Sequence, residues 1–509
     1  MGTEEKFIKH IQEGYQTKAD YIYLGAAMKE GAPHSCASVK IPLKTLNRHG
    51  LIAGATGTGK TKTLQILAEN LSQKGIPVVL MDMKGDLSGL AKPSPIADKL
   101  AGRHEKIGFE FTPKASPVEI LSLSNQNGVK LRATVSEFGP VLLSRILDLS
   151  PTQTGILAII FKYCDDKHMP LLDLEDLKKL VRYITEEGED DFEKKYGRVS
   201  KSSTGAILRK IVALEQQGGD RFFGEPSFEV KDLLKKNDLG EAFINIIRLN
   251  DIQDKPALFS TFILSLLAEI YSTFPEKGDS DQPELVMFID EAHLIFKEAS
   301  DALLDQIESI IKLIRSKGVG IYFVTQNPTD IPSEVLSQLG LKIQHALRAF
   351  TAKDRKAIKL TAQNYPLSDY YDTEEILTSL GIGEALVTAL DEKGRPTPLA
   401  ATMLRAPMSR MDILTSSEIE EVLKASKLID KYNQPVDRES AYEMLTKKIK
   451  EAEEETQKEK AKEQRKTVEK KTSRSTRSNG KSASDHILKV LTSATFIRGV
   501  MSILNKAFK

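Results

Sequence analysis

The stretch Leu51-Ile-Ala-Gly-Ala-Thr-Gly-Thr-Gly-Lys-Thr61 lies near the start of the chain and decides its fold. It opens with three apolar residues, which are typical of a short buried strand. Residues 62–74, which follow it, carry apolar side chains at the spacing of one helical face. Between strand and helix, the pattern Gly-x4-Gly-Lys-Thr has the spacing of a phosphate-binding loop. The stretch therefore predicts an α/β protein that binds a nucleoside triphosphate.

Each part of this loop has an expected task. Its glycines let successive backbone N–H groups point toward phosphate oxygens, and the positive end of the following helix lies at the same place. We expect Lys60 to bind the β- and γ-phosphates and Thr61 to coordinate Mg²⁺ through its hydroxyl. The implied cofactors are ATP and Mg²⁺. The predicted nucleotide-binding residues are Gly54, Ala55, Thr56, Gly57, Thr58, Gly59, Lys60, Thr61 and Lys62.

A second stretch, Leu285-Val-Met-Phe-Ile-Asp-Glu291, supplies two carboxylates directly after an apolar strand. In an open α/β sheet, ligands bind beyond the carboxyl ends of the strands, where these side chains would lie. We expect Asp290 to belong to the Mg²⁺ shell and Glu291 to polarise an attacking water as general base. Such a base favours hydrolysis over phosphoryl transfer to a substrate molecule.

Five further polar residues are candidates for the same site. Gln326 follows another apolar strand and is a candidate sensor of the γ-phosphate or the water. Arg315 and Arg348 are candidate arginine fingers, which stabilise negative charge on the transferred phosphoryl group. Asp82 ends the strand after the loop helix, and it either orients Mg²⁺ or water or forms a turn. His293 is expected to support the acidic pair and not to act in catalysis.

Strand-like and helical runs alternate on both sides of a long helical segment. This alternation predicts a mostly parallel sheet with helices on both faces. The apolar run 21–27 before it fits an edge strand. The predicted organisation is a short N-terminal segment (1–45), an ATPase domain (46–130 and 241–410), a helical insertion (131–240), a C-terminal helical element (411–446), a charged linker (447–483) and an amphipathic helix (484–509).

Charge is unevenly distributed along the 509 residues. The formal net charge is +1, but residues 446–481 carry 13 Lys and Arg against 7 Asp and Glu. The rest of the chain is therefore slightly acidic, which restricts any contact with nucleic acid to local basic sites. Two cysteines without metal-site spacing, no signal peptide and no run of ~18 apolar residues are typical of a cytoplasmic protein.

The last segment repeats apolar residues at alternating spacings of four and three, from Val490 to Phe508. This periodicity predicts an amphipathic helix. Docking on the core or pairing with a partner's helix is one interpretation. Binding to a membrane surface through the flanking basic residues is the other, and the sequence leaves both open.

Together, these motifs resemble the HerA/FtsK superfamily of P-loop ATPases, and within it the HerA-like family typified by the bacterial protein YjgR. The resemblance extends from about residue 40 to residue 445. The stretches that carry it are 47–61, 82–88, 215–219, 222–226, 289–293, 314–320 and 326–328.

The resemblance implies a RecA-like domain that assembles as a ring, with a hexamer favoured, and translocates duplex DNA. It gives the glycine loop, the acidic pair and Gln326 the roles described above. In the superfamily an arginine shortly before the sensor strand enters the neighbouring subunit's site, and Arg315 matches that placement better than Arg348 does. The first 45 residues are too short for the N-terminal barrel of HerA itself. A second interpretation therefore stays open: an ATP-driven switch or scaffold that remodels protein partners without nucleic acid.

Overall fold

The chain divides into two compact units. The computed structural model describes residues 2–451 apart from 279, 298–300, 435, 437 and 438, together with residue 454. The sheet unit comprises residues 1–131 and 228–434, and the helical unit comprises residues 132–227 and 435–509. The predicted C-terminal amphipathic helix and nearly all of the predicted charged linker lie outside the described residues.

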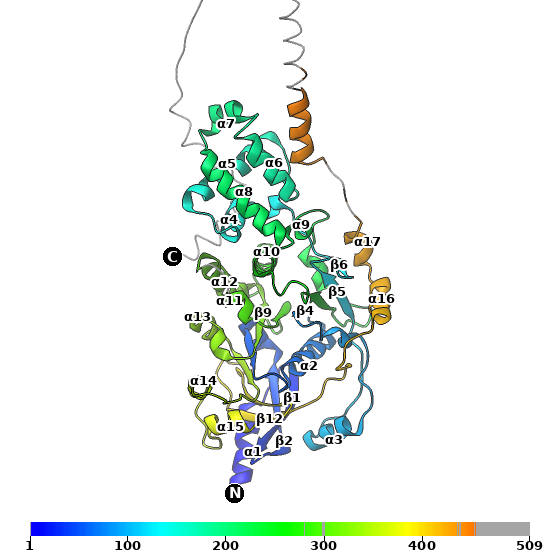
Figure 1. Ribbon diagram of the computed structural model, residues 1–509. Helices are drawn as coiled ribbons and strands as arrows, with labels where there is room; N and C mark the ends of the chain where they lie inside the picture. The colour runs from blue at the N-terminus through cyan, green and yellow to red at the C-terminus, as the bar shows by residue number, and fades with distance from the viewer. Residues whose placement is uncertain are drawn as a thin grey trace, which may run out of the picture. The chain divides into compact units, whose positions relative to one another are not determined.

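The sheet unit is built on one twelve-stranded sheet with the order β2-β1-β12-β11-β10-β3-β9-β8-β4-β7-β5-β6 (Figure 1). Neighbours from β10 to β6 run parallel, whereas the pairs from β2 to β10 run antiparallel. The mostly parallel α/β sheet predicted from the sequence is confirmed. The strands are β1 (Tyr21–Lys29), β2 (Ala32–Pro42), β3 (Gly50–Ala53), β4 (Val78–Asp82), β5 (Val118–Ser122), β6 (Val129–Lys130), β7 (Ile244–Arg248), β8 (Leu285–Ile289), β9 (Val319–Thr325), β10 (Leu341–Gln344), β11 (Glu384–Thr388) and β12 (Ala400–Leu404).

The central strands are apolar because both faces of the sheet are covered. β3, β4, β8 and β9 are buried at every position, as expected for parallel strands between layers of helices. In β3, Ile52 pairs with Ile343 of β10 on one side and with Val324 of β9 on the other. Because these strands are parallel, the glycine loop, the acidic pair and Gln326 all follow strands at the same carboxyl edge.

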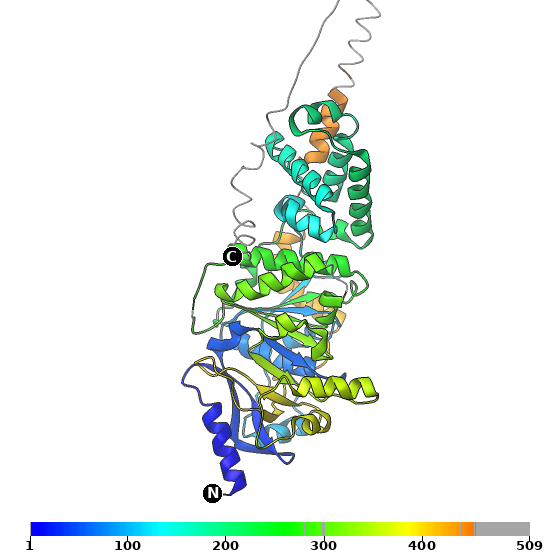
Figure 2. The same ribbon diagram turned by 90° about the vertical axis from the view of Figure 1, so that its left-hand side faces the viewer.

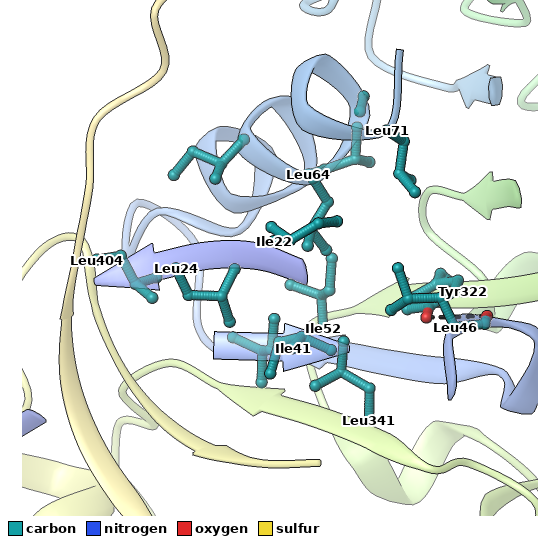
Figure 3. Packing of buried hydrophobic residues seen from close by; sticks show 14 of the residues in the cluster. Ile22, Leu24, Ile41, Leu46, Ile52, Leu64, Leu71, Tyr322, Leu341 and Leu404 are labelled. Atoms are coloured by element: carbon teal, nitrogen blue, oxygen red, sulfur yellow. Dashed lines mark hydrogen bonds between the residues drawn. The ribbon is translucent and has the colours of Figure 1, made fainter. Parts of the chain in front are cut away.

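The N-terminal residues are part of this sheet. An edge strand at 21–27 was the expectation, but β1 lies between β2 and β12 because β2 pairs along it and takes the edge position. Ile22 and Leu24 of β1 and Ile41 of β2 belong to the same buried cluster as Ile52 of the loop strand (Figure 3). The N-terminal segment thus helps to form the core beneath the glycine loop.

Helices lie on both sides of the sheet, with α2 on one side and α12 and α13 on the other (Figure 1). Figure 2 shows α10 and α12 side by side, where they pack against each other. The α-helices of this unit are α1 (Thr3–Gly14), α2 (Lys60–Gln73), α3 (Asp98–Ile107), α10 (Pro256–Thr273), α11 (His293–Lys297), α12 (Asp301–Ile314), α13 (Ser333–Leu336), α14 (Ala352–Ala362), α15 (Thr373–Ser379), α16 (Ser416–Ala425) and α17 (Leu428–Tyr432). Short 3₁₀ turns are η1 (Leu43–Arg48), η2 (Ser88–Ala91), η3 (Val230–Leu234), η4 (Arg315–Lys317) and η5 (Pro328–Asp330).

The helical unit holds six helices of the central segment together with the helical segment 441–451. Capping boxes at Thr134, Ser150 and Asp173 begin three of them, which explains where the chain enters each helix. The unit ends at residue 227, and residues 228–240 belong to the sheet unit. Its helices are α4 (Val135–Ile146), α5 (Pro151–Lys167), α6 (Leu174–Tyr183), α7 (Glu189–Tyr196), α8 (Lys201–Gln216) and α9 (Gly219–Phe222).

Among the described residues, no helix is both long enough and apolar enough to cross a membrane.

Candidate nucleotide site

The glycine loop, residues 54–59, is anchored to the strands on both sides of β3. The backbone N–H of Gly54 donates to the carbonyl of Thr325, which ends β9, at 3.3 Å. The N–H of Ala55 donates to the carbonyl of Ala346, which follows β10, at 2.8 Å. These two bonds turn the chain back over the carboxyl edge of the sheet before α2 begins.

Glycine is required where the loop approaches its neighbours most closely. At Gly54, where φ is +151°, an added Cβ would lie 2.5 Å from the Cβ of His345. Gly59 has a φ of +116°, in the left-handed region that other residues rarely adopt, and it lies directly before α2. Glycine is therefore needed at position 54 because of a close contact and at position 59 because of the backbone conformation.

Lys60 is the first residue of α2, and its side chain is buried over the loop. Its Nζ donates to the carbonyls of Gly54 at 2.7 Å and Ala55 at 3.1 Å. Burial lowers the pKa of Lys60, and the nearby charge of Lys84 lowers it further, whereas the acidic pair opposes this shift. The ammonium of Lys60 thus donates to two uncharged carbonyl oxygens. A charged phosphate oxygen is a stronger acceptor and would replace them.

Two side chains near the loop have partners elsewhere. The Nζ of Lys62 donates to the carbonyl of Met411, so this predicted nucleotide-binding residue contacts its own chain through the side chain. The carboxylate of Asp82 accepts three backbone N–H groups, from residues 85, 86 and 87. Of the two roles considered for Asp82, turn formation is the one that these bonds show. Burial raises its pKa to about 6, and the charge of Asp86 adds to this shift.

Asp290 follows β8 directly and is buried. Its Oδ2 has no hydrogen-bond partner among the described residues. Burial raises the pKa of Asp290 to about 7; the charge of Lys84 opposes this shift, and the charge of Glu291 adds to it. A buried carboxylate oxygen without a donor is costly, because it loses hydration and gains nothing in return. Such an oxygen is suited to binding a cation that arrives with a ligand.

Glu291 adopts a left-handed backbone with a φ of +48°, which is uncommon outside glycine. Three side chains surround its carboxylate. The Nζ of Lys84 lies 2.5 Å from Oε1, the Nδ1 of His293 lies 3.1 Å from Oε2, and the Nε2 of Gln326 lies 3.4 Å from both oxygens. Burial alone would raise the pKa of Glu291, but its hydrogen bond to Lys84 and the charges of Lys84 and His293 outweigh burial and lower it.

Sequence reasoning placed Asp290, Glu291, His293 and Gln326 near one another, and the structure brings them together. It gave no role to Lys84, which is the closest partner of Glu291. A signal was present, because Lys84 lies two residues past the end of β4, the strand that neighbours β8. A lysine at that edge faces the carboxylates that follow β8.

The two arginines lie at opposite edges of the sheet. Arg315 begins η4 at the amino end of β9, while Gln326 follows the carboxyl end of the same strand. Seven residues of strand separate the two ends, which corresponds to roughly 23 Å. Arg348 is exposed and lies two residues after Ala346, at the carboxyl edge beside the glycine loop. Of these two arginines, Arg348 is the one that lies at the same end of the strands as the glycine loop of its own chain.

A family model described as "Helicase HerA-like C-terminal" matches residues 28–507. The chain belongs to this HerA-like family. The DNA double-strand break repair helicase HerA of Sulfolobus acidocaldarius is 25% identical over 358 residues, which are 69% of this chain and 64% of that protein. The probable helicase MJECL08 of Methanocaldococcus jannaschii is 26% identical over 416 residues, which are 77% of this chain and 73% of that protein. The chain therefore spans less than two-thirds of the length of the archaeal HerA.

Solved structures show the same fold at low sequence identity. The unbound bacterial conjugative coupling protein TrwB superposes with a TM-score of 0.50 and 15% identity, covering 80% of this chain and 94% of that chain. TrwB in complex with ADP and Mg²⁺ gives a TM-score of 0.51 and 14% identity, covering 79% and 94%. The resemblance to P-loop ATPases predicted from the motifs is thus confirmed for this HerA-like chain at the level of family and fold.

Proposed function

We propose that this HerA-like chain binds ATP with Mg²⁺ and hydrolyses it at the carboxyl edge of its sheet. One observation carries the proposal: the buried, unpartnered oxygen of Asp290 stands beside Glu291 at the edge where the glycine loop presents Lys60. TrwB, which shares the fold, has been solved in complex with ADP and Mg²⁺. The residues present here fit those groups, because they offer an ammonium, a helix N-terminus and carboxylate oxygens.

The loop and α2 would bind the phosphates. Lys60 would leave the two loop carbonyls for the β- and γ-phosphate oxygens, which are stronger acceptors because they are charged. The first N–H groups of α2 have no partner within the helix and would donate to the same phosphates. The Thr61 hydroxyl and Asp290 would hold Mg²⁺. When bound, Mg²⁺ neutralises negative charge on the phosphoryl group.

Glu291 would take the proton from the attacking water. It is placed for this role by β8, which ends one residue before Asp290, and by the left-handed turn that follows. Gln326, which already contacts the carboxylate of Glu291, would orient the water or sense the γ-phosphate. A carboxylate base with an amide beside it fits hydrolysis better than phosphoryl transfer to a substrate.

We further propose that hydrolysis drives a ring, with a hexamer favoured, along duplex DNA. The support is that HerA relatives are named as DNA helicases, and that Arg315 lies at the edge of the sheet opposite its own glycine loop. A finger so placed acts on the site of a neighbouring copy. Arg315→Ala should therefore lower turnover in mixed assemblies only at sites that face a mutated neighbour. A defect confined to the mutated subunit's own site would contradict a finger that acts in trans.

The test is ATP hydrolysis by the full chain at low salt, with and without linear duplex DNA, together with the mass of the assembly in the presence of ATP. Lys60→Ala serves as the blank. The proposal expects turnover that DNA stimulates, a retarded DNA complex and a ring-sized mass. If DNA neither changes the turnover nor forms a complex with the protein, the translocase role is wrong. The alternative function, remodelling of protein partners, would then remain. Turnover equal to that of Lys60→Ala would remove the ATPase itself.

A further inference from the structure

The proposed base, Glu291, is not free to accept a proton in this structure. Its side chain is only 9% exposed, and its Oε1 is taken by the ammonium of Lys84 at 2.5 Å. The Nε2 of Gln326 donates to both oxygens at 3.4 Å, and the Nδ1 of His293 lies 3.1 Å from Oε2 without a hydrogen bond. A general base must turn a lone pair toward the proton that it abstracts. A carboxylate that holds the Lys84 ammonium on one oxygen and the Gln326 amide across both cannot do so until one of these donors leaves.

From this arrangement we infer that Lys84 is a brake on the site. While its ammonium is paired with Glu291, the carboxylate is withheld from water, and hydrolysis requires the pair to separate. Lys84 acts through Glu291 and is therefore a positioning residue. The inference rests on the proposed function, because it presupposes that Glu291 is the base of an ATPase.

The pair is built so that one partner can move. Glu291 is fixed by β8 and by the N–H of Ala292, which donates to the carbonyl of Val324 at 3.0 Å. Lys84, in contrast, is 37% exposed and reaches the carboxylate from a loop on a flexible four-carbon stem. The Lys84 end of the pair is open to solvent, so that the ammonium can leave the carboxylate without being buried elsewhere. A change in the position of the loop is therefore a route to release.

The Lys84 loop, residues 83–87, is tied to two exposed loops at the same edge. Gln253, in the loop after β7, donates to the carbonyl of Met83. Asn250, in the same loop, lies against Gly85, where an added Cβ would come within 3.6 Å of its side chain. The side chain of Gln126, in the loop after β5, donates to Asn250 at 2.9 Å.

These contacts give the brake a route of release. The Asp82 carboxylate closes the Lys84 loop at its base with three hydrogen bonds, so the loop moves as one piece. A ligand that displaces the exposed loops after β5 and β7 would pull on residues 83–85 and draw Lys84 away from Glu291. If the duplex DNA of the proposed function is that ligand, its binding would be linked to hydrolysis without any contact between DNA and the nucleotide.

The experiment compares wild type, Lys84→Met, Lys84→Arg and Lys92→Met in the full chain without DNA. Lys92→Met is the matched control, because Lys92 belongs to an exposed pair with Glu421. Turnover of ATP is measured together with the affinity for a fluorescent non-hydrolysable ATP analogue. Lys84→Met should raise kcat about fivefold, as expected for loss of a partly screened ion pair, with analogue affinity unchanged. Lys84→Arg should restore most of the brake.

The outcomes separate the brake from the function on which it rests. If Lys84→Met lowers kcat or leaves it equal to that of Lys92→Met while wild type hydrolyses ATP, the brake is wrong and the ATPase stands. If no variant hydrolyses ATP although all bind the analogue, the proposed function fails. If Lys84→Met weakens the affinity for the analogue more than tenfold, Lys84 binds phosphate and the brake is overturned.

Discussion

Glu69 and Glu291 are both glutamates of the sheet unit that are paired with cations, and they differ in how the pairs are built. Glu69 of α2 is 0% exposed and accepts from Arg405, which is 3% exposed, at 2.5 Å. It also accepts from the backbone N–H groups of Met408 and Ser409 and from the Ser409 hydroxyl. Glu291 is almost as buried, but all of its partners are side chains, and the nearest one is an exposed lysine.

The difference separates a structural carboxylate from a functional one. Every donor around Glu69 is fixed, by the backbone or by burial, so that pair ties α2 to the chain after β12. The donors around Glu291 can all rotate away, and the adjacent Asp290 keeps an oxygen without any partner. Buried polar groups are normally satisfied, and the Asp290 oxygen is an exception that lies where a ligand is expected, although it is one of several such atoms among the described residues. Three substitutions test this contrast.

The largest effect is expected at the satisfied pair. Glu69→Gln would leave Arg405 charged and buried, which costs about 3–5 kcal/mol of unfolding free energy. Chemical denaturation of the sheet unit within the full chain measures this loss. Glu421→Gln, which breaks the exposed pair with Lys92, is the control and should change stability by less than about 0.5 kcal/mol. An equal loss of stability in Glu69→Gln and Glu421→Gln would show that the buried pair of Glu69 is no more important for stability than an exposed pair.

A smaller effect is expected at Lys60, and on binding. Lys60→Ala should weaken ATP affinity roughly 100-fold, because it removes charge-assisted hydrogen bonds to the phosphates. Titration with a fluorescent ATP analogue measures it. The control is Lys74→Ala. Lys74 follows the last residue of α2 and pairs with exposed Asp20, so this variant should bind the analogue with wild-type affinity. If the affinity for ATP is unchanged in Lys60→Ala, the nucleotide does not bind at the carboxyl edge beside Lys60.

The smallest effect is expected at Asp290. Its pKa, raised to about 7 chiefly by burial, means that the folded state binds this proton more tightly than the unfolded chain. Stability of the metal-free protein then falls as pH rises from about 4 to about 7. Asp290→Asn should therefore stabilise the protein by about 1 kcal/mol at pH 8 in EDTA.

The pH dependence supplies the control for that substitution. The gain from Asp290→Asn should shrink as pH falls below 7, where the folded wild type becomes protonated. Thermal unfolding of both proteins across this range measures the difference. A loss of stability at pH 8 would show that the carboxylate is satisfied after all.

The sequence was most informative where chemistry depends on neighbouring residues. Strand, loop and helix around Lys60, and the strand before Asp290, were predicted because each motif is local. Lys84 was missed because its partner lies more than 200 residues away along the chain. β10 was missed because Lys342 and Gln344 interrupt its apolar pattern, and only its pairing with β3 and β11 makes it a strand. Long-range pairing of this kind leaves no periodic signal.

The most direct test of the ATPase site is a comparison of Glu291→Gln with wild type. The side chains have nearly equal volume, so that the fold and the nucleotide pocket should be retained. We predict that the variant binds ATP with wild-type affinity and hydrolyses it at least ~10²-fold more slowly, as expected for loss of a general base. Turnover within about threefold of wild type, with binding intact, would contradict the assignment of Glu291 and with it the proposed hydrolytic site.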